Sequence, residues 1–287
     1  MYDKILDGKK LADELNLELQ KKVKQAVEKT NVRPKLATIL VGEDPGSKVY
    51  VNIKQRTSSQ IGIETILIEL DKNISKESLM QKIKRLNEDN KIHAILLQFP
   101  LPKHLINEAP NLLAHISPDK DADGLTPLNR GKLFDYNEEL APCTPRGIIA
   151  LLEHYNIELK GKYVVIVNRS NLVGKPLIFM LLKRNATVSI CHTSTQNIDR
   201  YIKNADILIV AVGKPNFITK EMIKEDVVII DVGINRLKEK ICGDVDFKGV
   251  LEKCSKITPV PGGIGPLTVS FLFQNTFTAY KKQLSLK

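Results

Sequence analysis

Several residue types are scarce in this sequence, and their scarcity narrows the class of protein. The 287 residues include no tryptophan and only 5% aromatic residues, and the four cysteines are scattered without a Cys-x-x-Cys pair. We therefore expect thiols in a reducing cytoplasm, not a disulfide framework or a metal site. No apolar run approaches the roughly 18 residues that span a bilayer. Residues 1–8 lack a signal-peptide pattern, so we expect a cytoplasmic protein without membrane contacts.

The net charge of +10 raises the question of a nucleic-acid ligand. The longest purely basic runs are pairs such as Lys9-Lys10 and Lys281-Lys282, and no basic stripe alternates with aromatic residues. A lysine-biased composition, with some attraction for small anionic ligands, explains the charge better than nucleic-acid binding does. We therefore expect no nucleic-acid partner.

Short apolar runs alternate with helix-like segments along the whole chain. Strands are predicted over residues 36–41, 64–70, 92–97, 163–167, 187–191, 207–212 and 227–232. Helices are predicted over residues 8–29, 47–61, 75–89, 145–155, 174–184, 197–203, 219–224 and 267–282. The later strands are nearly continuous in Val, Ile, Ala and Leu, as expected when helices cover both faces of a sheet. The pattern predicts an α/β fold with mostly parallel sheet.

The chain length favours two lobes, because 287 residues lie at the upper limit for a single core. Residues 117–143 are rich in Pro, Asp, Gly and Asn and show the weakest periodicity, which is typical of a boundary or a functional segment. We predict an N-terminal α/β lobe over residues 1–143, completed by a C-terminal helix over residues 267–287. A Rossmann-like lobe is predicted over residues 144–266.

The segment after the first strand carries an aromatic ring and an amine at helical spacing. Residues 36–41 run into a polar turn over residues 42–46 and then a predicted helix with Ser47 as its N-cap. Tyr50 and Lys54 are four residues apart, so they share one face of that helix. A helix that leaves the carboxyl end of a strand points its first turns toward the ligand-binding crevice. An ordinary surface helix is the alternative.

Residues 163–176 have the order strand, tight loop and helix that begins a dinucleotide-binding unit. The usual Gly-x-Gly-x-x-Gly is absent, but Ser170 is small enough for close approach and Gly174 can serve helix packing. A plain βα turn is the alternative. The next strand ends in His192-Thr193 with no acid to hold a ribose 2′-hydroxyl, and Arg169 lies in the loop. This combination suits a 2′-phosphate and predicts NADP over NAD.

Two further predicted strand ends are followed by a turn with glycine, and one more segment is rich in Gly and Pro. Gly213 and Gly233 each stand where a backbone can approach a flat ligand. Residues 259–268 are the stretch densest in Gly and Pro, which predicts a stiff wall with bare amides against a planar ring. A simple turn between the lobes is the alternative.

Six motifs in this order resemble one family, the bifunctional methylenetetrahydrofolate dehydrogenase/methenyltetrahydrofolate cyclohydrolases. The resemblance spans essentially the whole chain without large insertions. The matching pieces are Tyr50-Val-x-x-Lys54, Leu97-Gln98-Phe99-Pro-Leu-Pro102, Pro118-Asp-Lys-Asp-Ala-Asp-Gly124, Pro142-Cys-Thr-Pro-Arg-Gly147, Asp231-Val-Gly-Ile-Asn235 and Pro261-Gly-Gly-Ile-Gly-Pro266.

The resemblance implies a homodimer with a cleft between the lobes, tetrahydrofolate on the first lobe and NADP on the second. Tyr50 would stack on the folate, Lys54 would be the cyclohydrolase residue with Gln98 as its partner, and Asp123 would hold the pterin. The remaining substrate-binding residues would be Leu97, Phe99, Pro261, Gly262, Gly263, Ile264 and Gly265. The cofactor-binding residues would be Asn168, Arg169, Ser170, Gly174, His192, Thr193, Gly213, Gly233 and Ile234.

The implied chemistry suits these residue types. A carboxylate such as Asp123 can accept the N–H and amino group that a reduced pterin presents side by side. Hydride removal from the methylene bridge needs the nicotinamide in position, whereas hydrolysis of the methenyl product needs a base. Lys54 can be that base only if part of it is neutral near pH 7, and burial, the substrate cation and Arg56 would each lower its pKa. Lys and Arg near the cleft could meet a polyglutamate tail.

Two positions depart from the family pattern. Asn168 stands where glycine is common, and we expect it to preserve the turn because Asn tolerates a left-handed backbone. Phe99 stands where leucine is common, which predicts a change in the pocket wall. Two other functions stay open at this point: a dehydrogenase with weak or no cyclohydrolase activity, and a basic α/β binding protein without catalysis.

Overall fold

The computed structural model describes residues 2–237 and 240–286, with the backbone alone described at residue 2 and over residues 45–50. The chain forms two compact units, each built from two segments. We call Glu14–Cys143 with Val269–Lys287 the three-stranded unit, and Met1–Asp13 with Thr144–Thr268 the five-stranded unit. Helices α1 (Gly8–Thr30) and α10 (Ile264–Gln283) contribute residues to both units.

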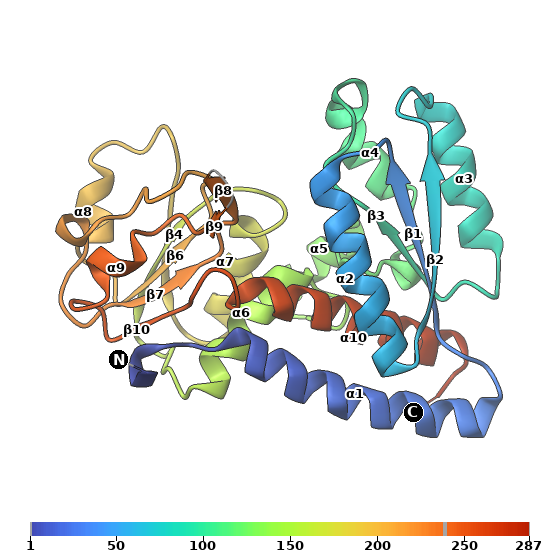
Figure 1. Ribbon diagram of the computed structural model, residues 1–287, viewed down its shortest axis with the longest axis horizontal. Coiled ribbons are helices and arrows are strands. Elements are labelled where there is room, and N and C mark those ends of the chain that lie inside the picture. The colour runs from blue at the N-terminus through green and yellow to red at the C-terminus, as the bar shows by residue number, and fades with distance from the viewer. Residues whose placement is uncertain (1, 238–239, 287) are drawn as a thin grey trace. The chain divides into compact units, whose positions relative to one another are not determined.

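The three-stranded unit contains a small parallel sheet (Figure 1). Strand β1 (Lys35–Val41) lies between β2 (Glu64–Leu70) and β3 (Ala94–Leu97), and a bridge between Ile95 and Asp121 extends the sheet beyond β3. Helix α3 (Lys76–Glu88) buries Leu79 and Ile83 against these strands. The remaining elements of this unit are α2 (Pro45–Ile61), η2 (Lys103–Glu108), α4 (Ala109–Ala114), η3 (Pro118–Lys120), α5 (Pro127–Lys132) and η4 (Leu133–Asp135).

The five-stranded unit contains a parallel sheet in the order β10-β7-β6-β4-β5. Its strands are β4 (Tyr163–Val167), β5 (Thr187–Cys191), β6 (Ile207–Val210), β7 (Val228–Asp231) and β10 (Lys256–Ile257). After β5 the chain returns to the other side of β4, so the strand order reverses between β4 and β6. Open α/β sheets bind ligands at such a switch point, outside the carboxyl ends of the strands.

Further elements outside the five-stranded sheet are η1 (Tyr2–Lys4), α6 (Cys143–His154), α7 (Gly174–Lys183), α8 (Ile198–Ile202), η5 (Lys220–Met222), α9 (Phe247–Val250) and the antiparallel pair β8 (Asn235–Leu237) and β9 (Lys240–Cys242).

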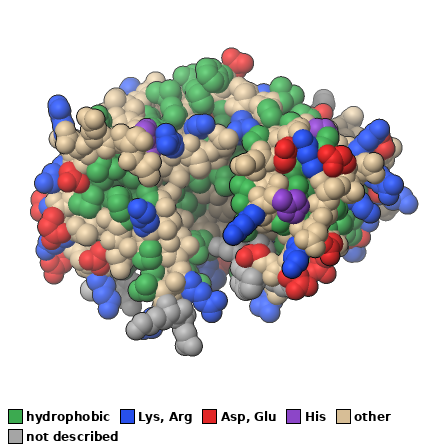
Figure 2. Space-filling model, turned by 90° about the horizontal axis from the view of Figure 1, so that it is seen from above, with side chains coloured by type: hydrophobic (Ala, Val, Ile, Leu, Met, Phe, Trp, Pro, Cys, Tyr) green, Lys and Arg blue, Asp and Glu red, His purple; other side chains and the backbone are tan. Residues whose placement is uncertain are grey.

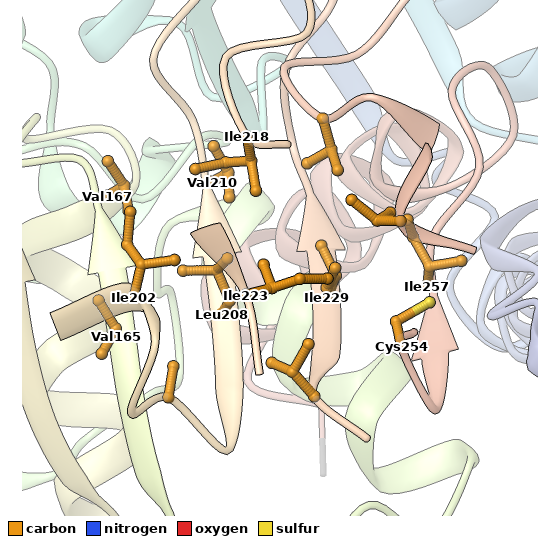
Figure 3. Close-up of a cluster of buried hydrophobic side chains, with 14 of the residues drawn as sticks. Val165, Val167, Ile202, Leu208, Val210, Ile218, Ile223, Ile229, Cys254 and Ile257 are labelled. Carbon is orange, nitrogen blue, oxygen red and sulfur yellow. The ribbon is translucent and has the colours of Figure 1, made fainter. Parts of the chain in front are cut away.

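The core of this unit is continuous across the strands. The strand register places Val165, Leu208, Ile229 and Ile257 in one row, and Figure 3 shows their side chains in one cluster. Because all five strands are parallel, their carboxyl ends lie at one edge of the sheet.

The seven predicted strands are all present, and each end lies within two residues of its predicted position. The helix predicted over residues 219–224 is wrong: the segment is a single 3-10 turn. Thr219 and Ile223 on either side of this turn are extended, and Ile223 packs into the sheet core. The weakly periodic segment over residues 117–143 contains three short helical elements, η3, α5 and η4.

The surface and the cysteines agree with an ordinary globular chain. On the face shown in Figure 2, Lys and Arg side chains are interspersed with Asp, Glu and hydrophobic ones instead of forming one stripe. None of the four cysteines, all of which are described, forms a disulfide. Within the described part of the chain, no helix has both the length and the apolar character needed to cross a bilayer. The described residues also contain no cluster of metal-ligating side chains.

Candidate active site

Lys54 and Gln98 meet at the carboxyl edge of the three-stranded sheet. Lys54 lies on α2, which follows β1, and Gln98 directly follows β3. The Lys54 Nζ donates a hydrogen bond of 2.7 Å to Gln98 Oε1, and Gln98 Nε2 donates one of 2.6 Å to the Phe99 carbonyl. The second bond fixes the orientation of the Gln98 amide: with Nε2 directed at the Phe99 carbonyl, Oε1 is directed at the Lys54 amine and can accept from it. Gln98 is buried and Lys54 is half-buried.

Burial lowers the pKa of Lys54 below its ordinary value of 10.5. The negative charges of Asp123 and Cys143 oppose this shift, but burial is the largest cause. Our expectation that Arg56 also lowers the pKa is wrong. Arg56 is exposed on another face of α2 and is not among the groups that shift Lys54. Loss of water thus shifts the Lys54 equilibrium toward the neutral amine, and no neighbouring cation is among the causes.

Asp123 lies close enough to Lys54 for the two charges to interact. Burial raises the pKa of the Asp123 carboxyl, and the charge of Asp121 adds to the rise. The Lys54 amine and a hydrogen bond from the Cys143 side chain act in the opposite direction. The structure therefore brings together three of the predicted catalytic residues, Lys54, Gln98 and Asp123, within the three-stranded unit.

The loop that carries Asp123 is held by groups that the sequence interpretation did not single out. The buried Asp121 carboxylate accepts hydrogen bonds from the backbone N–H groups of Leu125 at 3.1 Å and Thr126 at 2.7 Å. Asn275 on α10 donates through Nδ2 to the carbonyls of Ala122 at 3.0 Å and Ala141 at 3.1 Å. The sequence feature that could have identified Asn275 is the position of a polar residue within the apolar sequence of α10.

The remaining predicted residues of this unit are placed as follows. Helix α2 begins at Pro45, a favoured first helical residue, so Ser47 lies inside the first turn and the N-cap prediction is wrong. The backbone of Tyr50 lies in α2 four residues before Lys54, and its side chain is outside the described part of the structure. Leu97 ends β3 and is buried in the core, whereas Phe99 is half-buried.

The predicted folate wall over residues 261–265 belongs to the five-stranded unit. Residues 261–263 form the turn before α10, and Ile264 and Gly265 begin that helix. The Lys9 N–H donates to the Gly262 carbonyl at 2.8 Å. A Cβ at Gly8 would lie 1.9 Å from the Gly263 oxygen, so glycine is required where these backbones meet. The assignment of residues 261–265 to folate stays a prediction.

The Asn168 side chain organises the loop between β4 and α7. Its Oδ1 accepts hydrogen bonds from the Ser170 N–H and hydroxyl, both at 2.8 Å, and from the Gly174 N–H at 2.9 Å. Its Nδ2 donates to the Ala211 carbonyl at 2.6 Å, which joins the ends of β4 and β6. The expected left-handed backbone at Asn168 is wrong, since Asn168 is not among the residues with positive φ. The side chain preserves the turn instead.

This loop lies where open α/β sheets place a dinucleotide. A Cβ at Gly174 would lie 2.2 Å from the Asn168 carbonyl oxygen, so the strand end and the helix start approach as closely as glycine allows. The loop lies at the switch point between β4 and β6, where a dinucleotide is expected. Ser170 lies within it and supports it through its hydroxyl, which accepts from the Val173 N–H at 3.1 Å.

The other predicted cofactor residues lie at the carboxyl ends of neighbouring strands. Arg169 follows β4 and is exposed, and His192 and Thr193 follow the adjacent β5. The Ser194 N–H donates to His192 Nδ1 at 3.2 Å, so this nitrogen acts as an acceptor. Beyond these, Gly213, Gly233 and the half-exposed Ile234 follow β6 and β7. The structure places all nine predicted cofactor residues at one edge of the five-stranded sheet.

Comparison with known proteins identifies the family to which both parts of the chain belong. Residues 6–123 match the family model described as tetrahydrofolate dehydrogenase/cyclohydrolase, catalytic domain. Residues 142–284 match the family model described as tetrahydrofolate dehydrogenase/cyclohydrolase, NAD(P)-binding domain. The chain belongs to the tetrahydrofolate dehydrogenase/cyclohydrolase family. In this family member, Lys54, Gln98 and Asp123 lie in the segment that matches the catalytic domain.

Relatives within the family match over nearly the whole chain. The chain is 46% identical to "Bifunctional protein FolD" of Acetivibrio thermocellus, over 100% of both chains. It is 48% identical to the protein of the same name from Bacillus subtilis, over 98% of this chain and 99% of that protein.

Solved structures of the family share the fold. The bifunctional FolD enzyme from Campylobacter jejuni superimposes with a TM-score of 0.93 at 43% identity, covering 97% of this chain and 99% of that one. The Trypanosoma brucei methylenetetrahydrofolate dehydrogenase-cyclohydrolase, solved with NADP cofactor and inhibitor, gives a TM-score of 0.92 at 34% identity, covering 98% of each chain.

Proposed function

We propose that the chain oxidises 5,10-methylenetetrahydrofolate to 5,10-methenyltetrahydrofolate with NADP and then hydrolyses the product to 10-formyltetrahydrofolate. Membership of the family supports both activities. The observation that carries the second activity is the hydrogen bond of 2.7 Å from Lys54 Nζ to Gln98 Oε1 beside Asp123. This geometry favours the bifunctional enzyme over a dehydrogenase that lacks efficient hydrolysis.

In the first reaction the protein mainly holds the reactants in position. The residues that would hold NADP are the 168–174 loop and the turns after β5, β6 and β7, and NADP would supply the hydride acceptor. We propose that the Asp123 carboxylate accepts hydrogen bonds from the pterin N–H and amino group, because a carboxylate can accept two such donors side by side. Tyr50 would stack on the folate. Positioning of this kind accounts for most of the acceleration that hydride transfer needs.

In the second reaction we assign the role of general base to neutral Lys54. Water adds to the methenyl carbon and gives one proton to the Lys54 Nζ. As the bond between that carbon and N5 breaks, the hydroxyl loses its proton to become the formyl carbonyl on N10 and N5 gains a proton. The proton held by Lys54 then passes to solvent, so one proton is released in all. Gln98 Oε1 accepts one N–H of the amine and so aims its lone pair, without adding a negative charge that would favour the ammonium form.

A coupled assay with methylenetetrahydrofolate tests the proposal. We expect formation of NADPH followed by conversion of methenyl-folate to the formyl product. Accumulation of methenyl-folate at the full rate of NADPH formation would indicate the dehydrogenase without efficient hydrolysis. Absence of NADPH formation would contradict the proposed function as a whole.

The cofactor prediction can be tested at Arg169. We expect clearly tighter binding of NADP than of NAD, because the β5 end offers His192 and Thr193 but no acid. Arg169→Ala should weaken NADP binding about tenfold, the value of one charged hydrogen bond, and leave NAD binding unchanged. Lys175→Ala is the matched control, because the Lys175 side chain is also exposed and its Nζ donates to Asn171 Oδ1 at 3.0 Å. Tighter binding of NAD by the wild type would contradict the prediction.

We also propose that the enzyme is a homodimer. The family resemblance supports a dimer, and Ile241 on the β8–β9 pair is an apolar side chain that is 50% exposed, which makes it a candidate interface residue. Light scattering should give about twice the chain mass of 32.2 kDa. Ile241→Lys should shift the protein toward the monomer, and a monomeric wild type would contradict the proposal.

The state of the cysteines bears on where in the cell the protein acts. We propose a cytoplasmic location, since the four cysteines form no disulfide and three of them are buried as thiols. The substrates would be tetrahydrofolate derivatives, with or without a polyglutamate tail.

A further inference from the structure

A buried carboxylate, Asp244, binds the backbone of the turn that follows β6. Its Oδ2 accepts hydrogen bonds from the N–H groups of Val212 at 2.5 Å and Gly213 at 3.0 Å. Its Oδ1 accepts from the Lys214 N–H at 3.0 Å and from Asn235 Nδ2 at 2.7 Å. Asp244 is 0% exposed, so one inaccessible side chain joins three consecutive amides after β6 to a residue after β7.

A second carboxylate, Asp231 at the end of β7, holds the segment that carries Asp244. It accepts from the N–H groups of Gly233, Asp244 and Val245, each at 3.0 Å. Burial raises the pKa of Asp231 to about 6, the negative charge of Asp244 adds to the rise, and these three N–H groups oppose it. Both Asp231 oxygens accept from N–H donors, which is the hydrogen-bonding pattern of a carboxylate.

Two glycines make room for the two carboxylates. A Cβ at Gly233 would lie 2.2 Å from the carboxyl carbon of Asp244, and a Cβ at Gly243 would lie 1.8 Å from Asp231 Oδ2. None of the ion pairs found among the described residues involves either acid. Backbone dipoles thus compensate the buried charge, which makes the backbone conformation dependent on the carboxylates.

The groups held by Asp244 face the proposed cofactor site. Gly213 has a positive φ of 69°, and a Cβ there would meet nothing within 4 Å, so its Cα side is open to a ligand. Ile234 lies next to Asn235 and is 50% exposed. Asp244 therefore connects the two turns on which Gly213 and Ile234 stand, although it is itself inaccessible to any ligand.

We propose that Asp244 is a positioning residue for the cofactor. Its carboxylate fixes the turn of residues 212–214 relative to Asn235, and so sets the spacing between Gly213 and Ile234. This inference rests on the proposed binding of NADP at these two turns. It assigns to Asp244 a selective effect on cofactor binding and hydride transfer, with no effect on the Lys54 chemistry of the three-stranded unit.

Asp244→Asn tests the inference, because it keeps the size of the side chain but replaces one acceptor oxygen by a donor. We expect the amides of residues 212–214 to exchange with deuterium at least about tenfold faster in the cofactor-free protein, since one of the two oxygens that accept from them is replaced by a donor. The Kd for NADP measured by calorimetry should rise about tenfold or more, equivalent to about 1.4 kcal/mol. Hydrolysis of supplied methenyltetrahydrofolate should keep its wild-type rate.

Asp206→Asn is the matched control on the same sheet. The Asp206 carboxylate also accepts from a backbone N–H, that of Tyr163 at 2.8 Å, and pairs with Lys224 at 2.6 Å. It lies just before β6, at the opposite, amino edge of the strands. We expect Asp206→Asn to leave the exchange of residues 212–214 and the Kd for NADP unchanged.

Each remaining outcome decides one of the two claims. If the wild type binds NADP and Asp244→Asn binds it equally well, the positioning role is overturned, whether or not exchange is faster. If the wild type binds neither NADP nor NAD, the proposed cofactor function fails instead.

Should Asp244→Asn not fold, Asn235→Ala removes one of the four donors to Asp244 without burying a new group. Unchanged affinity in that variant would overturn the inference, and a severalfold weaker affinity would support it.

Discussion

Replacement of Lys54 by Met should abolish the cyclohydrolase activity and leave the dehydrogenase in place. Met keeps the length and apolar stem of lysine but has no amine. We expect the rate of methenyltetrahydrofolate hydrolysis to fall by about 10³-fold, within the range of 10² to 10⁴ that a general base contributes. NADPH formation should persist, since hydride transfer needs positioning and no proton acceptor. The readout is accumulation of methenyl-folate in the coupled assay.

The control for this experiment lies two residues further along α2. Arg56→Met makes the same kind of change on an exposed face of the helix, and Arg56 does not shift the pKa of Lys54. Both activities of Arg56→Met should match those of the wild type. Full hydrolysis by Lys54→Met would remove Lys54 from the mechanism. Equal loss of both activities would show that the amine serves substrate binding, not proton transfer.

Much of this site could be predicted from the sequence because of how parallel sheets are built. Apolar runs mark the strands, and parallel strands bring the residues that follow them to one edge. Gln98 directly follows β3, and Asp123 follows the bridged residue Asp121, so their meeting with Lys54 on α2 is a consequence of strand order. The same rule brings the residues after β4, β5, β6 and β7 together in the other unit.

The supporting contacts could not be predicted in this way. Asn275 reaches Ala122 and Ala141 across 153 and 134 residues of sequence, and Asp244 reaches Val212 across 32. Hydrogen bonds between residues so far apart leave no periodic signal. At Asn168 the sequence indicated the right turn for the wrong reason, because its contribution comes from a side-chain amide and not from its backbone conformation.

Replacement of Asp123 by Asn should weaken folate binding and at the same time change the pH dependence of hydrolysis. The amide keeps one acceptor oxygen but presents N–H groups to the pterin donors. We expect the KM for methenyltetrahydrofolate to rise about 10²-fold, or about 2.7 kcal/mol, in line with the loss of a charge-assisted hydrogen bond. Asp119→Asn is the control, because Asp119 is on the same segment but is exposed and pairs with Lys282 at 3.3 Å.

The pH dependence separates the anchoring role of Asp123 from its electrostatic role. Neutral Lys54 is the active form, so kcat/KM for hydrolysis should rise with pH and level off above the Lys54 pKa, which burial places below 10.5. The charge of Asp123 raises that pKa, and its removal should therefore move the rising limb to lower pH. Gln98→Glu should move the limb to higher pH, since it places a negative charge at the acceptor 2.7 Å from Lys54 Nζ.

Opposite shifts of the rising limb in Asp123→Asn and Gln98→Glu would identify it as the titration of Lys54. A limb that stays in place in both would assign the titration to another group, even if the KM of Asp123→Asn rises as expected.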